Sequence, residues 1–254
     1  MSITAPAALS LQDVGLQIGG ARILEEVTFE VAPGEMVGVI GPNGAGKTTL
    51  FNLISGVLKP TSGTISMAGH PLDRLPIHRR AAAGLGRTFQ TSSLFPGLGV
   101  EENIRLAAQA KLGGSLSILH FPKTGDEAGH IAEKCIAEVG LEAKRRARAG
   151  DLSHGDKRKV EIAMLLAADP TVILLDEPMA GVGSGDVPAL TEIIRKMHRE
   201  SERTVMMVEH HMDVVLDLAD RVAVMHHGSL LAIDSPDAIV ANPTVQSAYL
   251  GETV

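Results

Sequence analysis

The stretch GPNGAGKTT, residues 41–49, decides the fold of this chain. Its spacing fits G-x-x-x-x-G-K-[ST], in which glycines let backbone N–H groups turn inward around an anion. The preceding EMVGVI (35–40) has the apolar run of a buried strand, and residues 47–55 have the pattern of a helix that Gly56 ends. A strand, a glycine-rich loop and a helix starting at that loop predict a site for phosphate groups. We call residues 41–49 the phosphate loop.

The chemistry of such a site needs a cation-binding hydroxyl and nearby carboxylates. Lys47 is expected to reach the β- and γ-phosphates, and the Thr48 hydroxyl to bind Mg²⁺. The stretch VILLDE supplies Asp176, to hold Mg²⁺ directly or through water, and Glu177, to polarise an attacking water. No N-K-x-D motif for reading guanine occurs, so ATP is favoured over GTP. The predicted phosphate contacts are Gly41, Pro42, Asn43, Gly44, Ala45, Gly46, Lys47, Thr48 and Thr49.

Hydrophobic periodicity predicts an α/β fold. Val27, Phe29 and Val31 alternate with polar residues as in strands with one buried face. Helical patterns then occupy 100–112, 126–140 and 156–168, before α/β alternation resumes after Pro170. We therefore expect a P-loop NTPase (RecA-like) core with an N-terminal antiparallel β part and an inserted helical subdomain.

Composition limits the possible partners. The net charge of −7 disfavours broad nucleic-acid binding, which depends on Lys and Arg neutralising phosphates. The single cysteine, Cys135, forms no internal disulfide, which fits a reducing compartment. The N-terminus lacks the pattern of a signal peptide, and no stretch approaches the roughly 18 apolar residues of a membrane span. Membrane association would therefore require a partner protein.

Four further stretches follow the phosphate loop along the chain, in the order GRTFQ (86–90), LSHGD (152–156), MAGVG (179–183) and VMMVEHHM (205–212). Together with the phosphate loop and VILLDE, this order resembles the ATP-binding cassette of ABC transporters across essentially the whole chain. The resemblance implies one ABC ATPase domain over 1–254. Its approximate parts are a catalytic core of 1–92 and 160–254 and a helical signature subdomain of 93–159.

The resemblance also implies roles for single residues. Gln90 matches the glutamine that touches Mg²⁺ and the attacking water, and His210 matches the switch histidine that contacts the γ-phosphate. Ser153, His154, Gly155 and Asp156 match the signature that completes the ATP site of a second ATPase subunit. The loop around Gln90 faces the membrane subunit in this family, and Leu94, Phe95 and Leu98 are candidate anchors for it.

Three positions depart from the family pattern. Ile18 replaces the aromatic residue that usually stacks on adenine, so the contact lacks π-stacking. Asp156 replaces the usual glutamine and adds a negative charge near the expected γ-phosphate. We expect its side chain to turn away, or to meet Lys157 or Arg158. Gly183 replaces the usual aspartate after the catalytic glutamate, which bears on communication between the two sites.

One subgroup gives a closer resemblance. The stretches EIAMLLAADPTVILLDEPMAGV (161–182) and VEHHMDVVLDLADRVAVM (208–225), and the tail NPTVQSAYLGE (242–252), resemble ATPase subunits of branched-chain amino-acid importers. Close relatives of these serve urea, amides and related small polar solutes. The subgroup implies a peripheral subunit on the cytoplasmic face of the membrane, dimeric with itself or a sister ATPase. It would bind permease subunits and, through them, a periplasmic or extracellular solute-binding protein.

Other functions compete with this interpretation. An export or lipid-extraction cassette has the same phosphate chemistry. A non-transport cassette ATPase of DNA repair or translation usually carries long coiled-coil insertions or two cassettes, and neither is evident here. A P-loop kinase or another soluble NTPase would leave Gln90, LSHGD and His210 without roles.

Overall fold

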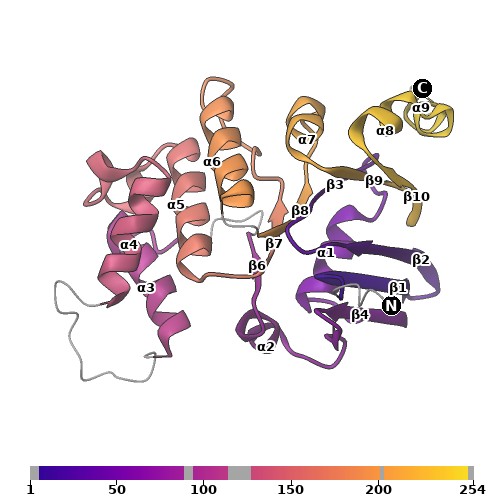
Figure 1. Cartoon of the computed structure of the whole chain (residues 1–254), viewed down its shortest axis with the longest axis horizontal. Coiled ribbons are helices and arrows are strands. Elements are labelled where there is room, and N and C mark those ends of the chain that lie inside the picture. Colours follow the sequence, from indigo (N-terminus) through magenta and orange to yellow (C-terminus); the bar gives the residue numbers. More distant parts are fainter. Residues whose placement is uncertain (1–5, 89–93, 114–126, 201–202, 251–254) are drawn as a thin grey trace, which may run out of the picture. The chain divides into compact units, whose positions relative to one another are not determined.

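The structure is a computed structural model that describes residues 6–88, 94–113, 127–200 and 203–250. It divides into two compact units (Figure 1). The first unit contains Met1–Leu85, Thr171–Glu177 and His198–Val254, and the second contains Gly86–Pro170 and Pro178–Met197. The division into 1–92, 93–159 and 160–254 stays a prediction.

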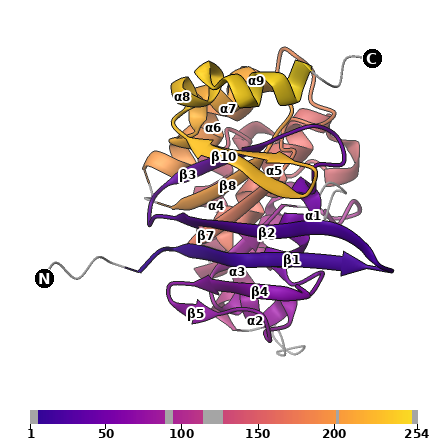
Figure 2. The same cartoon turned by 90° about the vertical axis from the view of Figure 1, so that its right-hand side faces the viewer.

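The first unit begins with an antiparallel sheet, which confirms the predicted antiparallel part. Its strands lie in the order β2-β1-β4-β5, and Figure 2 shows them broadside. Apolar residues on alternate positions are buried because one face of the sheet covers the core. The strands are β1 (Leu9–Ile18), β2 (Ala21–Val31), β4 (Ser62–Met67) and β5 (His70–Pro71).

The second sheet holds the phosphate loop. Its order is β10-β9-β3-β8-β7-β6; β9, β3, β8 and β7 run parallel to one another, whereas β10 pairs antiparallel with β9. All five residues of β3, β7 and β8 are buried, as expected for parallel strands covered on both faces. The strands are β3 (Met36–Ile40), β6 (Leu85–Arg87), β7 (Val172–Asp176), β8 (Thr204–Val208), β9 (Arg221–His226) and β10 (Ser229–Asp234).

Helix α1 (Lys47–Ser55) lies between the two sheets. Its Leu50, Phe51, Leu53 and Ile54 share one hydrophobic cluster with residues of β1, β2 and β4 and with residues of β3, β7 and β8. This packing fixes the helix that carries the phosphate loop. The other helices of the unit are α2 (Ile77–Ala82), α7 (Met212–Leu218), α8 (Pro236–Ala241) and α9 (Pro243–Leu250).

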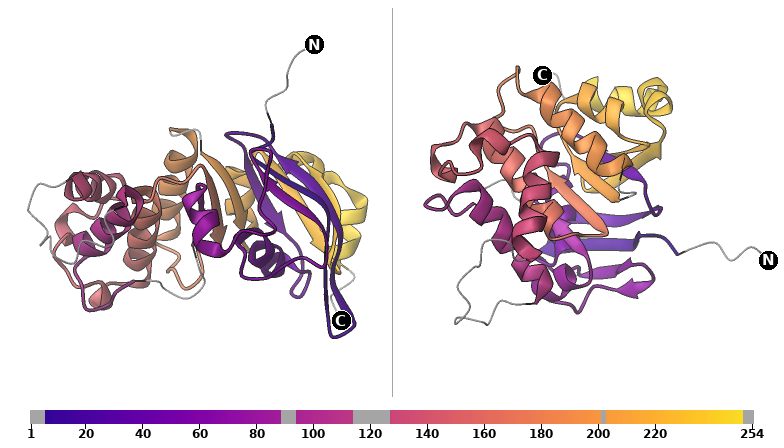
Figure 3. Two further views of the ribbon diagram at one scale, coloured as in Figure 1. Left: turned by 90° about the horizontal axis from the view of Figure 1, so that it is seen from below. Right: turned by 60° about the vertical axis from the view of Figure 1, so that its left-hand side comes forward.

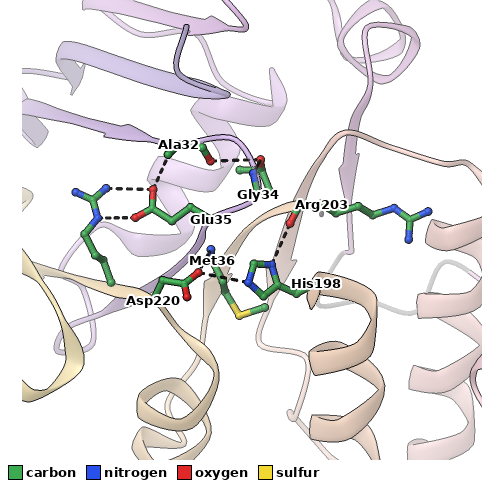
Figure 4. A network of polar contacts seen from close by, with 9 residues as sticks. Ala32, Gly34, Glu35, Met36, His198, Arg203 and Asp220 are labelled. Atoms are coloured by element: carbon green, nitrogen blue, oxygen red, sulfur yellow. Dashed lines mark hydrogen bonds and ion pairs between the residues drawn. The ribbon is translucent and has the colours of Figure 1, made fainter. Parts of the chain in front are cut away.

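Polar contacts fix the amino ends of the central strands (Figure 4). The Asp220 carboxylate accepts a hydrogen bond from the Met36 N–H at 2.8 Å and lies 3.3 Å from His198 Nε2. The other ring nitrogen of His198 lies 3.0 Å from the Arg203 carbonyl oxygen. Glu35 accepts from the Arg221 guanidinium and from the Ala32 N–H. The opposite, carboxyl edge of the same strands carries the predicted site.

The second unit is mostly helical (Figure 3). Helices α3 (Val100–Leu112), α4 (Glu127–Glu138) and α5 (His154–Ala167) pack against one another and bury Ile104, Ala132, Cys135, Ile136 and Ala163. Two short 3₁₀ turns, η1 (Glu142–Lys144) and η2 (Ala149–Asp151), precede α5, and α6 (Val187–Arg199) continues into the first unit at His198. None of the helices in the described part of the chain is long and apolar enough to cross a membrane.

Candidate nucleotide site

The phosphate loop connects β3 to α1. Helix α1 begins at Lys47, and its N-cap Gly46 has a φ of 97°, in the left-handed region that favours glycine. A Cβ at this position would lie 2.5 Å from the Leu24 side chain, so a larger residue would clash. Because Gly46 has no side chain to cap the helix, the N–H groups of the first turn are available to an anion.

Lys47 folds back over its own loop. Its side chain is buried, and Nζ donates to the Gly41 carbonyl oxygen at 2.5 Å and to the Pro42 carbonyl oxygen at 2.8 Å. A buried ammonium needs acceptors, and charged phosphate oxygens are stronger acceptors than peptide carbonyls. The lysine is therefore placed to exchange loop carbonyls for phosphate. Of the other loop residues, Gly41 and Ala45 are buried, Asn43 and Gly44 are exposed, and Pro42, Gly46, Thr48 and Thr49 are half-buried.

Strand β7 ends in the two predicted carboxylates. Asp176 is 1% exposed, and Glu177 follows it with a φ of 48° and a backbone N–H that donates to the Val208 carbonyl of β8 at 2.9 Å. Strand β8 lies between β7 and β3 in the parallel sheet. Asp176, Glu177 and the phosphate loop therefore all lie at the carboxyl edge, where α/β proteins bind ligands.

His210, two residues beyond β8, contacts Glu177. The distance from His210 Nε2 to Glu177 Oε1 is 3.1 Å. Because an ionised carboxylate only accepts hydrogen bonds, Nε2 is the donor in this pair. The structure thus joins the residue predicted to act on water with the residue predicted to contact the γ-phosphate.

Glu209 belongs to the same site, although sequence reasoning did not single it out. Its side chain is buried, and Oε2 accepts from the backbone N–H of His210 at 2.8 Å and of His211 at 3.2 Å. The same oxygen lies 3.1 Å from His211 Nδ1. Glu209 therefore fixes the turn that carries His210. A sequence signal for it exists: like Glu177, Glu209 is an acid directly after an apolar strand.

Two described side chains offer oxygen ligands for a metal ion. Thr48 lies in the first turn of α1, and Asp176 at the end of β7. A hydroxyl and a carboxylate are the donor types that suit Mg²⁺. Gln90, the third predicted ligand, lies outside the described residues.

Two of the departures from the family pattern lie at the surface. Ile18 ends β1, is 55% exposed, and is followed by the turn of Gly19 and Gly20. An exposed aliphatic side chain can pack on a flat base, although it offers no π face. Gly183 lies exposed in the loop before α6, where its carbonyl accepts from the Asp186 N–H at 2.8 Å.

The signature residues begin α5 in the second unit. Ser153 is the N-cap, and its Oγ accepts from the Asp156 N–H at 3.2 Å. Ser153 and His154 are exposed, whereas Gly155 is buried. A Cβ at Gly155 would lie 2.7 Å from an Asp186 carboxylate oxygen, so glycine here makes room for a side chain of the same unit.

The Asp156 side chain meets Lys144 and Ser153 rather than Lys157 or Arg158. Its Oδ2 accepts from Lys144 Nζ and, at 3.0 Å, from Ser153 Oγ. Burial by itself raises the pKa of Asp156. The hydrogen bonds from Lys144 and Ser153, with the charges of Lys144 and Lys159, outweigh burial and hold that pKa below its usual value. Asp156 is therefore ionised at neutral pH.

The loop before α3 presents an apolar side chain. Phe95 is 53% exposed, and Leu94 and Leu98 are half-buried. Asn103, which is fully buried, accepts from the Phe95 N–H at 2.8 Å and donates to the carbonyls of Phe95 at 3.2 Å and Gly99 at 2.9 Å. Asn103, which sequence reasoning missed, thus fixes the backbone beneath Phe95.

These features define the class of protein. A phosphate loop at the carboxyl edge of a parallel sheet, acids ending a neighbouring strand and a histidine on one of those acids are the parts of a P-loop nucleotide hydrolase. The family model described as ABC transporter matches residues 24–180, and the chain belongs to this family of ATP-hydrolysing cassettes. A second model, described as branched-chain amino acid ATP-binding cassette transporter, matches residues 229–254.

Similar proteins cover nearly the whole chain. The high-affinity branched-chain amino acid transport ATP-binding protein LivG of Escherichia coli K12 is 36% identical over 249 residues, which are 96% of this chain and 98% of LivG. The lipopolysaccharide export system ATP-binding protein LptB of Acidithiobacillus ferridurans is 35% identical over 231 residues, 91% of each chain. A solved nucleotide-free ATP-binding cassette from an ABC transporter superposes with a TM-score of 0.83 at 27% identity, covering 97% of this chain and 100% of that one. The predicted fold class and ATPase activity are confirmed.

Proposed function

We propose that this chain is the energy-coupling subunit of an importer for branched-chain amino acids or a related small polar solute, such as an amide or urea. The contact of 3.1 Å between Glu177 and His210 supports the hydrolytic part of the proposal. The solute class is supported by the family model matched at residues 229–254 and by the similarity to LivG.

In the proposed reaction, each described side chain has one task. Lys47 and the first-turn N–H groups of α1 hold the β- and γ-phosphates. Glu177 accepts a hydrogen bond from the attacking water, and His210, which bonds Glu177 in this structure, would turn its Nε2–H to the γ-phosphate when nucleotide binds. Mg²⁺, when bound, neutralises phosphate charge, and Thr48 and Asp176 would hold it together with Gln90.

ATP would be bound between two cassettes. Cassettes of this family work as dimers with membrane permease subunits. We place the phosphate loop of one cassette opposite Ser153 and Gly155 of the other, either in a homodimer or with a sister ATPase. The cassettes would lie on the cytoplasmic face of the membrane, with Phe95 in the permease contact and a solute-binding protein delivering the solute outside.

Replacing Glu177 with glutamine tests the hydrolytic assignment. Glu177→Gln keeps the shape of the side chain but accepts a proton poorly, so turnover should fall by about 100-fold or more while ATP still binds. ATP-bound dimers should then accumulate in size-exclusion chromatography. Glu26→Gln is the matched control, because Glu26 is exposed, lies in β2 and has the same φ of 48°. Near-normal turnover by Glu177→Gln would remove Glu177 from the mechanism.

Uptake into proteoliposomes tests the solute. The chain would be reconstituted with the permease subunits and binding protein encoded beside its gene, with ATP enclosed. ATP-dependent uptake of labelled leucine, valine, urea or acetamide, abolished by Glu177→Gln, is the expected result. The similarity to LptB supports export as the second candidate. Lipid-stimulated ATP turnover with no solute uptake would replace import by export.

A further inference from the structure

Asp156 places an acidic side chain at the start of α5, where the proposed function requires a phosphate of the partner cassette's ATP to bind. Ser153 caps α5, and Asp156 lies in the first turn of the same helix. Helix N-termini attract anions, and a carboxylate in the first turn competes for that attraction and repels an incoming phosphate. The arrangement around Asp156 therefore decides whether Ser153 can act on a nucleotide.

The hydrogen of the Ser153 hydroxyl is already committed within the chain. Ser153 Oγ donates to Asp156 Oδ2 at 3.0 Å and accepts from the Asp156 N–H at 3.2 Å. A hydroxyl has one hydrogen to donate, so Ser153 must release Asp156 before it can donate to a phosphate oxygen. Asp156 is almost entirely buried, and a buried carboxylate that loses a donor becomes less stable unless another donor remains.

Lys144 is that remaining donor. Its Nζ bonds the same oxygen, Asp156 Oδ2, that the Ser153 hydroxyl bonds. The Lys144 side chain is 51% exposed and the Asp156 side chain 11% exposed, so the cation covers the carboxylate from the solvent side. Among the residues that the structure describes, Lys144 is the one cation that hydrogen-bonds Asp156.

Neighbouring charges do not substitute for Lys144. Arg158 pairs with Glu161 at 2.7 Å, and Arg145 pairs with Glu101 at 2.6 Å. Lys159 acts on Asp156 only through space. Asp186, close to Gly155, adds a second carboxylate but is exposed and can turn into solvent.

The backbone that carries Lys144 is held in place. Lys144 ends η1, and the residues after it are bonded to the start of α3: the Ala147 and Arg145 carbonyls accept from Val100 and Glu101, each at 3.0 Å. The lysine is therefore presented to Asp156 by a fixed turn, which reduces the conformational entropy lost on pairing.

We propose that Lys144 is a positioning residue for ATP-driven dimerisation: it holds and neutralises Asp156 while the Ser153 hydroxyl turns from Asp156 to the γ-phosphate bound by the partner cassette. This inference rests on the proposed function, in which Ser153 contacts nucleotide across the dimer. Lys144, Asp156 and Ser153 belong to the second unit, and Asp156 Oδ2 accepts hydrogen bonds from both of the other two.

An ATP titration of dimer formation, made in the Glu177→Gln background, tests the proposal. Lys144→Met should raise the ATP concentration for half-maximal dimer by about three- to tenfold, the effect of removing the cation from a partly exposed ion pair. Adding Asp156→Asn to Lys144→Met should return this ATP concentration to within about twofold of the Glu177→Gln background, because no carboxylate charge then needs to be neutralised. Lys144→Arg should retain most of the wild-type behaviour. The increase in this ATP concentration caused by Lys144→Met should become smaller as the salt concentration is raised.

Controls separate this inference from the function on which it rests. Lys134→Met removes another ion-paired lysine of the second unit, 3.7 Å from Glu138 in α4, and should leave the titration unchanged. Fluorescent-ATP binding to the monomer should be the same in every variant, which verifies folding. If Ser153→Ala leaves dimerisation unchanged, the trans site and the inference both fail. If Ser153→Ala weakens dimers but Lys144→Met does not, or Asp156→Asn does not rescue it, only the Lys144 inference is overturned.

Discussion

A single buried arginine caps the helix that carries the phosphate loop. Arg80 of α2 is 1% exposed, and its NH1 donates to the Leu53 and Ile54 carbonyls of α1, each at 2.7 Å, while Nε donates to the Leu75 carbonyl at 2.9 Å. Helix α1 has no basic residue of its own in its last turn. Arg80 therefore supplies the positive charge that favours a helix C-terminus.

Replacing Arg80 should destabilise the first unit. Arg80→Met removes the arginine donor from the Ile54 and Leu75 carbonyls and leaves the Leu53 carbonyl with the Gly56 N–H alone, and should lower the free energy of unfolding by about 2–4 kcal/mol, with Arg80→Lys in between. Urea denaturation followed by circular dichroism measures this. Arg79→Met, at the exposed neighbouring position, should cost about 0.5 kcal/mol or less. Equal losses at the two positions would mean that the capping contacts contribute nothing.

The site residues that the sequence predicts are those whose role depends on local spacing. The phosphate loop and Asp176–Glu177 are recognised because neighbouring residues supply strand, turn and charge. Lys144 and Asn103 are different, since each acts through residues brought near by folding. Lys144 lies 12 residues before Asp156, whereas Lys157 and Arg158 directly follow it. Sequence proximity therefore favoured the wrong cations.

At the scale of elements, a bidentate ion pair between Arg145 and Glu101, which we call the charged fork, holds the start of α3. Arg145 donates through Nε and NH2 to the two carboxylate oxygens of Glu101, at 2.9 and 2.6 Å. The hydrogen bonds from Arg145 lower the pKa of Glu101, burial opposes them, and the charges of Arg145, Arg146 and Arg105 lower it further. The fork ties the turn around η1 to the first turn of α3.

This fork predicts a pH dependence of stability. A carboxyl group whose pKa is lowered by folding stabilises the protein above its unfolded pKa, about 4.3 for Glu, and loses that contribution as pH falls through the folded pKa. Glu101→Gln should therefore lower the urea midpoint at pH 7, and its difference from the wild type should disappear toward acid pH. Glu142→Gln, at an exposed position of η1, is the control. A difference for Glu101→Gln that is constant from pH 3.5 to 7 would contradict this.

Element types could be predicted well, and element ends less well. The helix expected over 126–140 is observed as Glu127–Glu138, because Gly140 takes a φ of 69° and the chain leaves the helix there. The helix expected from 156 begins at His154, since the Ser153 side chain caps it two residues earlier. Hydrophobic periodicity identifies a buried face, whereas side-chain caps and left-handed glycines set the ends.

On the scale of the whole molecule, the proposed function assigns a phosphate to two helix starts. One is α1 in the first unit and the other is α5 in the second. The proposed function uses them in different cassettes, so an isolated monomer would hold two incomplete halves. The order of the six motifs along the sequence was enough to predict this family. The solute could not be predicted in the same way, because in the proposed function this subunit does not contact the solute.

Hydrolysis should therefore depend on protein concentration. If the site needs two cassettes, the ATPase rate of the purified chain should rise faster than linearly with concentration until dimers dominate. A coupled assay from nanomolar to tens of micromolar protein, with Glu26→Gln as reference and Glu177→Gln as blank, measures this. Strict proportionality down to nanomolar protein would contradict a shared site.

The backbone of Glu177 also bears on how this sequence can evolve. Its φ of 48° lies in the left-handed region, which costs a residue other than glycine about 1 kcal/mol. Glu177→Gly would relieve that cost and remove the proposed carboxylate at once. Selection for stability and selection for turnover therefore oppose each other at one codon. A lineage released from the need for hydrolysis is expected to lose this glutamate early.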